Sequence, residues 1–148
     1  MIHRMDTTDW PAGTTLALEP DPAPAFRAEL ARHIHAFHSR TVPYEAQRFG
    51  LALRNGEGRL LAGMTGLTSW GWLFVEAVWV DDVQRGRGTG RRLMEAAETY
   101  ARTQGCHSAW LDTFQAEGFY RALGYERFGV LDDYPAGQTR AFLRKRLG

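Results

Sequence analysis

The chain has 148 residues, 44% of them apolar, and a formal net charge of +1, so it suits one globular domain over residues 1–148. The near-neutral charge excludes a global attraction to nucleic acid or to an anionic membrane, and the single cysteine, Cys106, excludes an internal disulfide framework. No apolar run approaches the roughly 20 residues that span a bilayer, and we therefore expect a cytoplasmic protein.

The first part of the chain changes character at Pro24. The segment from Asp9 to Pro24 holds four prolines, the last of them Pro24 itself, and predicts strand and loop. The apolar residues that follow recur at helical spacing: Phe26, Leu30, Ile34 and Phe37. The same segment carries three histidines: His33, His35 and His38. The first two point about 200° apart on a helix, so we interpret them as histidines of a polar face and expect no metal site.

The middle of the chain predicts an antiparallel meander of three strands. Two strand-like runs, Phe49–Arg54 and Arg59–Thr68, flank an Asn-Gly turn, which is a strong hairpin signal. A second turn at Ser69-Trp70-Gly71 leads into a third strand, Val75–Val80. Three tryptophans crowd this region, and we interpret them as packing residues, with a wall of an acceptor pocket as the alternative: Trp70, Trp72 and Trp79.

The most informative stretch runs from this third strand through a glycine loop, 85–90, into an amphipathic helix, Arg91–Gln104. A glycine loop that leads into a helix N-terminus exposes unpaired N–H groups and the positive end of the helix dipole, which together bind phosphate. The spacing of its glycines does not match a dinucleotide fingerprint, and no Gly-Lys-Ser/Thr follows, so neither a Rossmann loop nor a nucleotide triphosphatase loop fits.

The remaining elements alternate between strand and helix. Gly105 ends the long helix, and Ser108–Phe114 forms a strand that must run parallel to Val75–Val80 because a helix connects them. A short helix, Ala116–Leu123, is followed by two strands around the turn 132–137: Tyr125–Val130 and Thr139–Arg146.

Two motifs in this region resemble the GCN5-related N-acetyltransferase (GNAT) superfamily. The first is Arg-x-x-Gly-x-Gly, from Arg85 to Gly90, and the second is the segment Thr113–Tyr125, which contains Gly-Phe-Tyr-Arg-Ala-Leu-Gly-Tyr. The resemblance implies an α/β fold with a mixed, mostly antiparallel sheet flanked by helices. Its central parallel strand pair, Val75–Val80 and Ser108–Phe114, is expected to be splayed open.

By this resemblance the cosubstrate is acetyl-CoA, whose pantetheine arm enters the gap in the sheet. Thr113 stands where many family members have an asparagine that bonds the pantetheine, and Gln115 is the expected substitute. The other implied cofactor-binding residues lie on the third strand and in the glycine loop: Val78, Trp79, Val80, Arg85, Gly86, Arg87, Gly88, Thr89, Gly90 and Arg91.

The resemblance also implies two catalytic residues. Tyr120 matches the tyrosine that protonates the coenzyme A sulfur, and its alternative role is an aromatic residue of the core. Glu76 matches a glutamate that accepts the amine proton in one branch of the family, and its alternative role is a structural carboxylate paired with an arginine. Asp112 is expected to be structural.

The expected function is transfer of acetyl from acetyl-CoA directly to a primary amine, with a small molecule as the favoured acceptor. A protein or peptide amine is an alternative acceptor, and a sensor that binds acyl-CoA without turnover is a third interpretation. An RNA-binding module is weaker, because the arginines gather in one loop. We expect no nucleic-acid or membrane partner, and a homodimer is compatible with the sequence.

Overall fold

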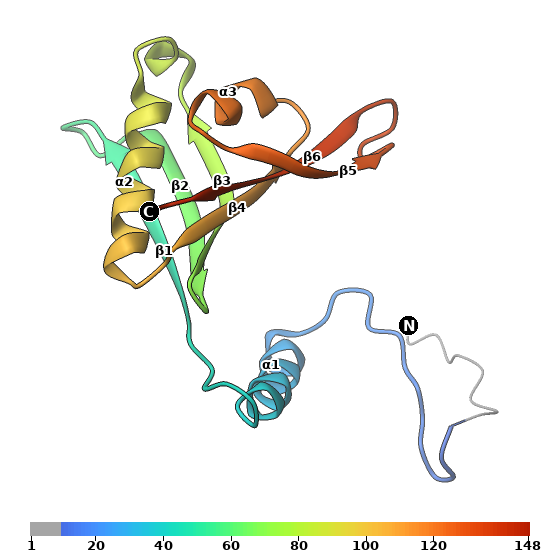
Figure 1. Cartoon of the computed structure of the whole chain (residues 1–148). Helices are drawn as coiled ribbons and strands as arrows, with labels where there is room; N and C mark the ends of the chain where they lie inside the picture. Colours follow the sequence, from blue (N-terminus) through green and yellow to red (C-terminus); the bar gives the residue numbers. More distant parts are fainter. Residues whose placement is uncertain (1–9) are drawn as a thin grey trace. The chain divides into compact units, whose positions relative to one another are not determined.

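The computed structural model describes residues 10–148, and its contacts divide the chain into two units, 1–44 and 45–148. The first unit contains helix α1 (Pro24–His38), which begins at a proline, a residue that the first helical turn tolerates (Figure 1). Residues 10–23 contain one bridge residue, Ala17, and no strand, so the strand predicted before Pro24 is wrong there; Asp9 lies outside the described residues. The prolines remove the N–H donors that a strand would need.

The second unit is built on a six-stranded sheet, whose strands are β1 (Ala46–Arg54), β2 (Leu60–Ser69), β3 (Trp72–Val80), β4 (Ser108–Thr113), β5 (Glu126–Asp132) and β6 (Thr139–Arg146). Their order in the sheet is β1-β2-β3-β4-β6-β5. All neighbouring strands are antiparallel except β3 and β4, which confirms the predicted fold class and the three-stranded meander. Within residues 10–148 no helix combines the length and the apolar character that crossing a bilayer requires.

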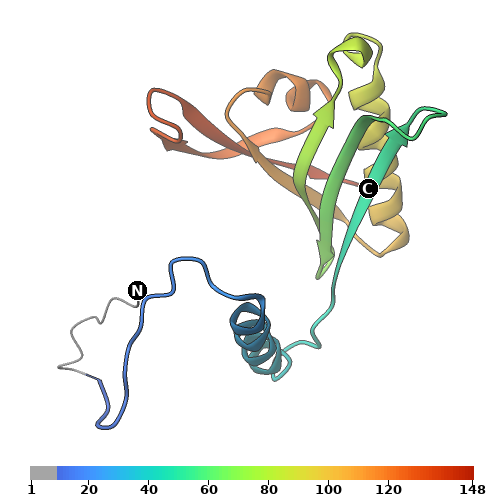
Figure 2. The same ribbon diagram turned by 180° about the vertical axis from the view of Figure 1, so that it is seen from behind.

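Helix α2 (Thr89–Thr103) covers one face of this sheet (Figures 1 and 2). Helix α2 contacts β2 and β3, and its apolar face is buried in a core that includes Met94, Ala97, Ala101, Met64, Leu73, Leu111 and Leu143. A buried ion pair, with Lys145 Nζ 2.6 Å from Glu98 Oε1, links α2 to β6. These contacts set the position of the α2 N-terminus relative to the sheet.

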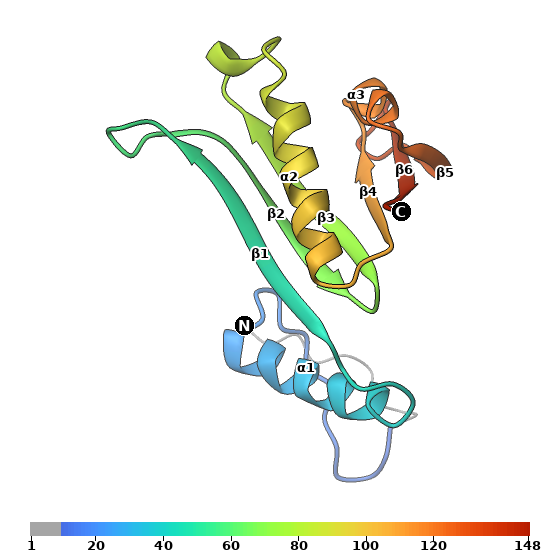
Figure 3. The same cartoon turned by 60° about the vertical axis from the view of Figure 1, so that its left-hand side comes forward.

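Strands β3 and β4 pair over a short distance and then separate. Their parallel register runs from Trp72–Ser108 to Phe74–Trp110 and includes no later pair, although β3 continues to Val80 and β4 to Thr113. Figure 3 shows the two strands diverging toward the ends that lead into the glycine loop and into helix α3 (Glu117–Ala122). The predicted opening between the two parallel strands is therefore confirmed.

Candidate active site

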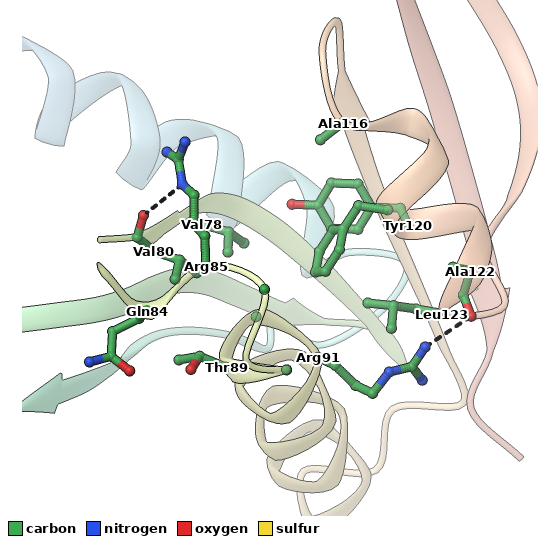
Figure 4. A pocket seen from close by; sticks show the side chains of 14 residues that line it. Val78, Val80, Gln84, Arg85, Thr89, Arg91, Ala116, Tyr120, Ala122 and Leu123 are labelled. Carbon is green, nitrogen blue, oxygen red and sulfur yellow. Dashed lines mark hydrogen bonds between the residues drawn. The ribbon is translucent and has the colours of Figure 1, made fainter. Parts of the chain in front are cut away.

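A cavity of about 520 Å³ lies where β3, the glycine loop, the start of α2 and α3 meet. We call it the loop cavity (Figure 4). It also borders the short helix η1 (Asp82–Gln84) that precedes the glycine loop. Its lining residues are Val78, Val80, Gln84, Arg85, Gly86, Gly88, Thr89, Gly90, Arg91, Ala116, Phe119, Tyr120, Ala122 and Leu123.

The loop cavity is chemically suited to an anion. Gly86 and Gly88 both have positive φ, 74° and 77°, which lets the loop turn directly into α2. The first hydrogen bond of the helix runs from the Arg92 amide to the Gly88 carbonyl, at 3.1 Å. The amides of residues 89–91 come before this bond and are the donors that the start of a helix leaves for a ligand. The first turn of α2 has no acidic residue, and this end of the helix therefore favours a bound anion.

Two arginine side chains form hydrogen bonds with backbone carbonyls at the wall of this cavity. Arg85 donates from Nε to the Val80 carbonyl at 3.3 Å and forms an ion pair with Asp82 at 3.0 Å. Arg91 donates from Nη2 to the Ala122 carbonyl at 3.5 Å, which connects α2 to α3; both hydrogen bonds are drawn in Figure 4. Arg87 is exposed and does not line the cavity.

A second cavity, of about 290 Å³, occupies the opening between the two parallel strands, and we call it the gap cavity. It is lined by Val75, Glu76, Ala77, Val78, Leu111, Asp112, Thr113, Phe114, Gln115, Ala116, Tyr120 and Arg140. Val78, Ala116 and Tyr120 line both cavities. The two cavities therefore meet at these three residues, one of which carries a hydroxyl group.

Tyr120 is 8% exposed, and its ring packs edge-on against Phe119 and Tyr125, at centroid distances of 4.9 and 5.9 Å. Figure 4 shows its hydroxyl directed toward the side of the cavity where Val78 lies. Burial raises the pKa of Tyr120 above its usual range, because the low-dielectric surroundings disfavour the phenolate. The side chain is therefore a neutral hydroxyl that can donate a proton at physiological pH.

The raised pKa of Tyr120 predicts the position of one limb of the pH profile. A group whose pKa is raised keeps its proton until the pH exceeds the usual tyrosine value, so loss of the Tyr120 proton should lower kcat only above about pH 10. Steady-state turnover from pH 6 to about pH 10 checks this prediction. A fall centred near pH 8 that disappears in Tyr120→Phe would contradict it.

Glu76 reaches the gap cavity from an irregularity in β3. Thr65 pairs with Ala77 and Gly66 pairs with Val75, so Glu76 is an extra residue between two ladder pairs, as in a β-bulge. Its carboxylate Oε1 lies 3.4 Å from Nη2 of Arg48, whose side chain is 73% exposed. Glu76 therefore has an arginine partner, as expected for a structural carboxylate. It also lines the gap cavity, as a catalytic base would have to.

A family model described as the acetyltransferase (GNAT) family matches residues 4–125 of the chain. The chain belongs to this family. It is 43% identical over 93 residues to a blasticidin-S acetyltransferase of Streptomyces morookaense, an alignment that covers 61% of this chain and 68% of the relative. It is 31% identical over 121 residues to an acetyltransferase of Agrobacterium fabrum, covering 75% and 88%.

A solved acetyltransferase from Bacillus cereus has a similar GNAT fold, with 27% identity and a TM-score of 0.75 over 87% of this chain and 96% of that one. The predicted family is therefore confirmed, and the chain is an acetyl-CoA-dependent acetyltransferase with acetyl-CoA as cosubstrate.

The structure distributes the predicted GNAT site residues over three cavities. Nine of them line the loop cavity: Val78, Val80, Arg85, Gly86, Gly88, Thr89, Gly90, Arg91 and Tyr120. Thr113 and Gln115 line the gap cavity instead, and Thr113 Oγ1 accepts a hydrogen bond from the Ala116 amide at 3.1 Å. Trp79 is 47% exposed and lines a third cavity, of about 330 Å³, over β1, β2 and β3.

Several cavity residues were not predicted from the sequence. In the loop cavity these are Gln84, Ala116, Phe119, Ala122 and Leu123, and in the gap cavity the main omission is Arg140. Phe119 approaches α2 at Gly90, where a Cβ would lie 3.1 Å from its ring atom Cζ, and this contact is visible only in the structure. The glycine at position 90 therefore allows the Phe119 ring to approach α2. Arg140 carries no local signal, since strand pairing alone brings it to this cavity.

Proposed function

We propose that this acetyltransferase moves the acetyl group of acetyl-CoA directly to a primary amine of a small molecule, in a ternary complex. The observation that supports this most is the junction of the two cavities at Val78, Ala116 and Tyr120. In this proposal the diphosphate lies at the glycine loop, the thioester lies at the junction, and the acceptor enters the gap cavity. The volume of the gap cavity, about 290 Å³, suits a small acceptor.

The proposed chemistry uses three groups of the chain. Glu76 takes a proton from the acceptor ammonium, whose pKa in a lysine-like amine is about 10.4, and the neutral amine attacks the thioester carbon. The backbone amide of Val78 polarises the carbonyl while the C–N bond forms. As the C–S bond breaks, the Tyr120 hydroxyl donates its proton to the departing thiolate. The nitrogen of the adduct then loses its second proton, which restores the Tyr120 hydroxyl. Glu76 releases its proton to solvent, and the thiol and the amide leave.

The name of the Streptomyces relative supports a small-molecule acceptor, because that protein is described as acting on blasticidin-S. A screen of small amines, aminoglycosides and peptides for release of free coenzyme A thiol tests the proposal. Thiol release with small amines and not with peptides is the expected result. Release with peptides alone would assign a peptide acceptor, and acetyl-CoA binding without any release would assign a sensor.

The two interpretations of Glu76 predict different outcomes for two substitutions. If Glu76 accepts the amine proton, Glu76→Gln should lower kcat by about 10² or more at neutral pH, whereas Arg48→Gln should retain kcat. Steady-state kinetics of both variants measures this difference. If Glu76 only pairs with Arg48, the two substitutions should have equal and small effects, because exposed ion pairs stabilise a protein by at most about 1 kcal/mol.

The other expectations from the sequence stay predictions: a cytoplasmic location, a single domain over residues 1–148, and no nucleic-acid partner. A homodimer also stays a prediction, and sedimentation of the purified chain would measure it.

A further inference from the structure

The gap cavity presents charged groups of both signs from different strands. Glu76 belongs to β3, Asp112 to β4 and Arg140 to β6, and all three line the cavity. The partner of Glu76 is Arg48, at 3.4 Å and 73% exposed, and such a solvated pair is easily exchanged for another cation. These four side chains sum to zero formal charge, so an acceptor with one positive and one negative group would leave the site neutral.

Arg140 is held firmly at this site. Its Nη1 donates to Asp112 Oδ1 at 2.7 Å, and both side chains are largely buried, 22% and 26% exposed. The guanidinium carbon lies 4.0 Å from the centroid of the Tyr134 ring and 5.5 Å from that of Phe114. An ion pair and two aromatic contacts therefore fix the orientation of the guanidinium group.

The guanidinium of Arg140 retains donors beyond this ion pair. A guanidinium has five N–H groups, and the hydrogen bond to Asp112 uses one of them. The Nε atom is buried and has no hydrogen-bond partner among residues 10–148. Because Nε is buried, the donors left for a ligand are those of Nη1 and Nη2, and the planar guanidinium geometry matches a carboxylate. The group that best satisfies these donors is thus an anionic oxygen pair.

We propose that Arg140 determines acceptor specificity by binding a carboxylate of the acceptor, so that the preferred acceptors are amino acids. The inference rests on the proposed function, because it places the acceptor in the gap cavity. The amine lies toward Glu76 and Val78, and the carboxylate lies toward Arg140. A cavity of about 290 Å³ is suited to a molecule of this size.

The test uses two sets of three acceptors: alanine, alaninamide and isopropylamine, and β-alanine, β-alaninamide and propylamine. In the wild-type protein, kcat/KM should be at least about tenfold higher for the better amino acid than for its amide and its simple amine. In Arg140→Gln this ratio should fall to about one through the acceptor KM, with the KM for acetyl-CoA unchanged. Arg140→Lys should recover only part of the ratio, because lysine lacks the planar fork.

Arg144→Gln is the matched control. Arg144 lies on the same strand, pairs with Glu126 at 3.7 Å and lies over the Phe128 ring at 5.6 Å, but it lines a different cavity. It should retain the wild-type preference. Because Arg140→Gln leaves Asp112 without its partner, the double variant Arg140→Gln/Asp112→Asn provides a second measurement in which neither charge is left unpaired.

Three results would overturn the inference while leaving acetyl transfer intact. The first is an equal kcat/KM preference for the amino acid in wild-type protein and Arg140→Gln. The others are equal use of the amino acid and its amide, and a preference for the simple amines. Thiol release by other amines of the screen, but by none of these six acceptors, would also overturn the inference. If no acceptor, here or in the screen, releases thiol, the proposed function fails instead. Calorimetric binding of alanine and β-alanine to the coenzyme A complex then decides the inference: binding that Arg140→Gln abolishes supports it, and no binding overturns it.

Discussion

Tyr120→Phe should lower kcat by about 10² or more while leaving the affinity for acetyl-CoA nearly unchanged. The substitution removes the one hydroxyl at the junction of the two cavities and keeps the aromatic ring that packs against Phe119 and Tyr125. The thiolate would then leave without a proton donor. Single-turnover and steady-state measurements of thiol release, with calorimetry of acetyl-CoA binding, measure the two quantities separately.

Tyr125→Phe is the matched control for this experiment. Tyr125 is also buried, 2% exposed, and lies in edge-on contact with Tyr120, but it lines neither cavity. Its hydroxyl has no hydrogen-bond partner in the described part of the chain. We expect Tyr125→Phe to retain turnover. Equal turnover in Tyr120→Phe and Tyr125→Phe would remove Tyr120 from the mechanism.

Gly88→Leu should raise the Kd of acetyl-CoA by about tenfold or more, which corresponds to about 1.4 kcal/mol of binding free energy. Gly88 has φ 77°, and a Cβ built on it meets no atom within 4 Å, so the added side chain would extend into open space beside the loop. In our proposal this space receives the diphosphate. Isothermal titration calorimetry with acetyl-CoA measures the effect.

Gly105→Leu provides the control, because it reproduces the backbone strain without the cavity. Gly105 has φ 84°, also meets no atom within 4 Å, and follows the other end of α2. Both substitutions should lower the melting temperature by similar amounts, since each forces a leucine into the left-handed region. Affinity should fall only in Gly88→Leu. An equal loss in both variants would attribute the effect to strain and reject the loop assignment.

The sequence alone was sufficient for the elements whose signals are local. The Asn-Gly turn, the glycine loop and the apolar spacing of residues 91–104 each predicted a feature that the structure contains, within a few residues. Strand β3 begins at Trp72 rather than at Val75, and α2 begins at Thr89 rather than at Arg91. The strand predicted before Pro24 is wrong for residues 10–23, because the prolines of this segment lack the N–H donors that strand pairing needs.

The cavities depend on contacts between distant parts of the chain. Glu76 faces the gap cavity at an extra residue in β3, which the pairing of Thr65 and Gly66 determines. Arg140 reaches Asp112 across 28 residues because β6 pairs with β4 in antiparallel register. The family resemblance singled out Glu76, but neither the irregularity in β3 at Glu76 nor the approach of Arg140 to Asp112 has a local signal in the sequence.

By itself the sequence determined the glycine loop, the helix that follows it and the short helix that carries Tyr120, because backbone preference and helical periodicity act over a few neighbouring residues. Only the tertiary structure decided that Val78, Tyr120 and Arg140 line two adjoining cavities. The physical reason is that strand register and the early separation of β3 from β4 are set by long-range pairing and burial, which no local pattern encodes.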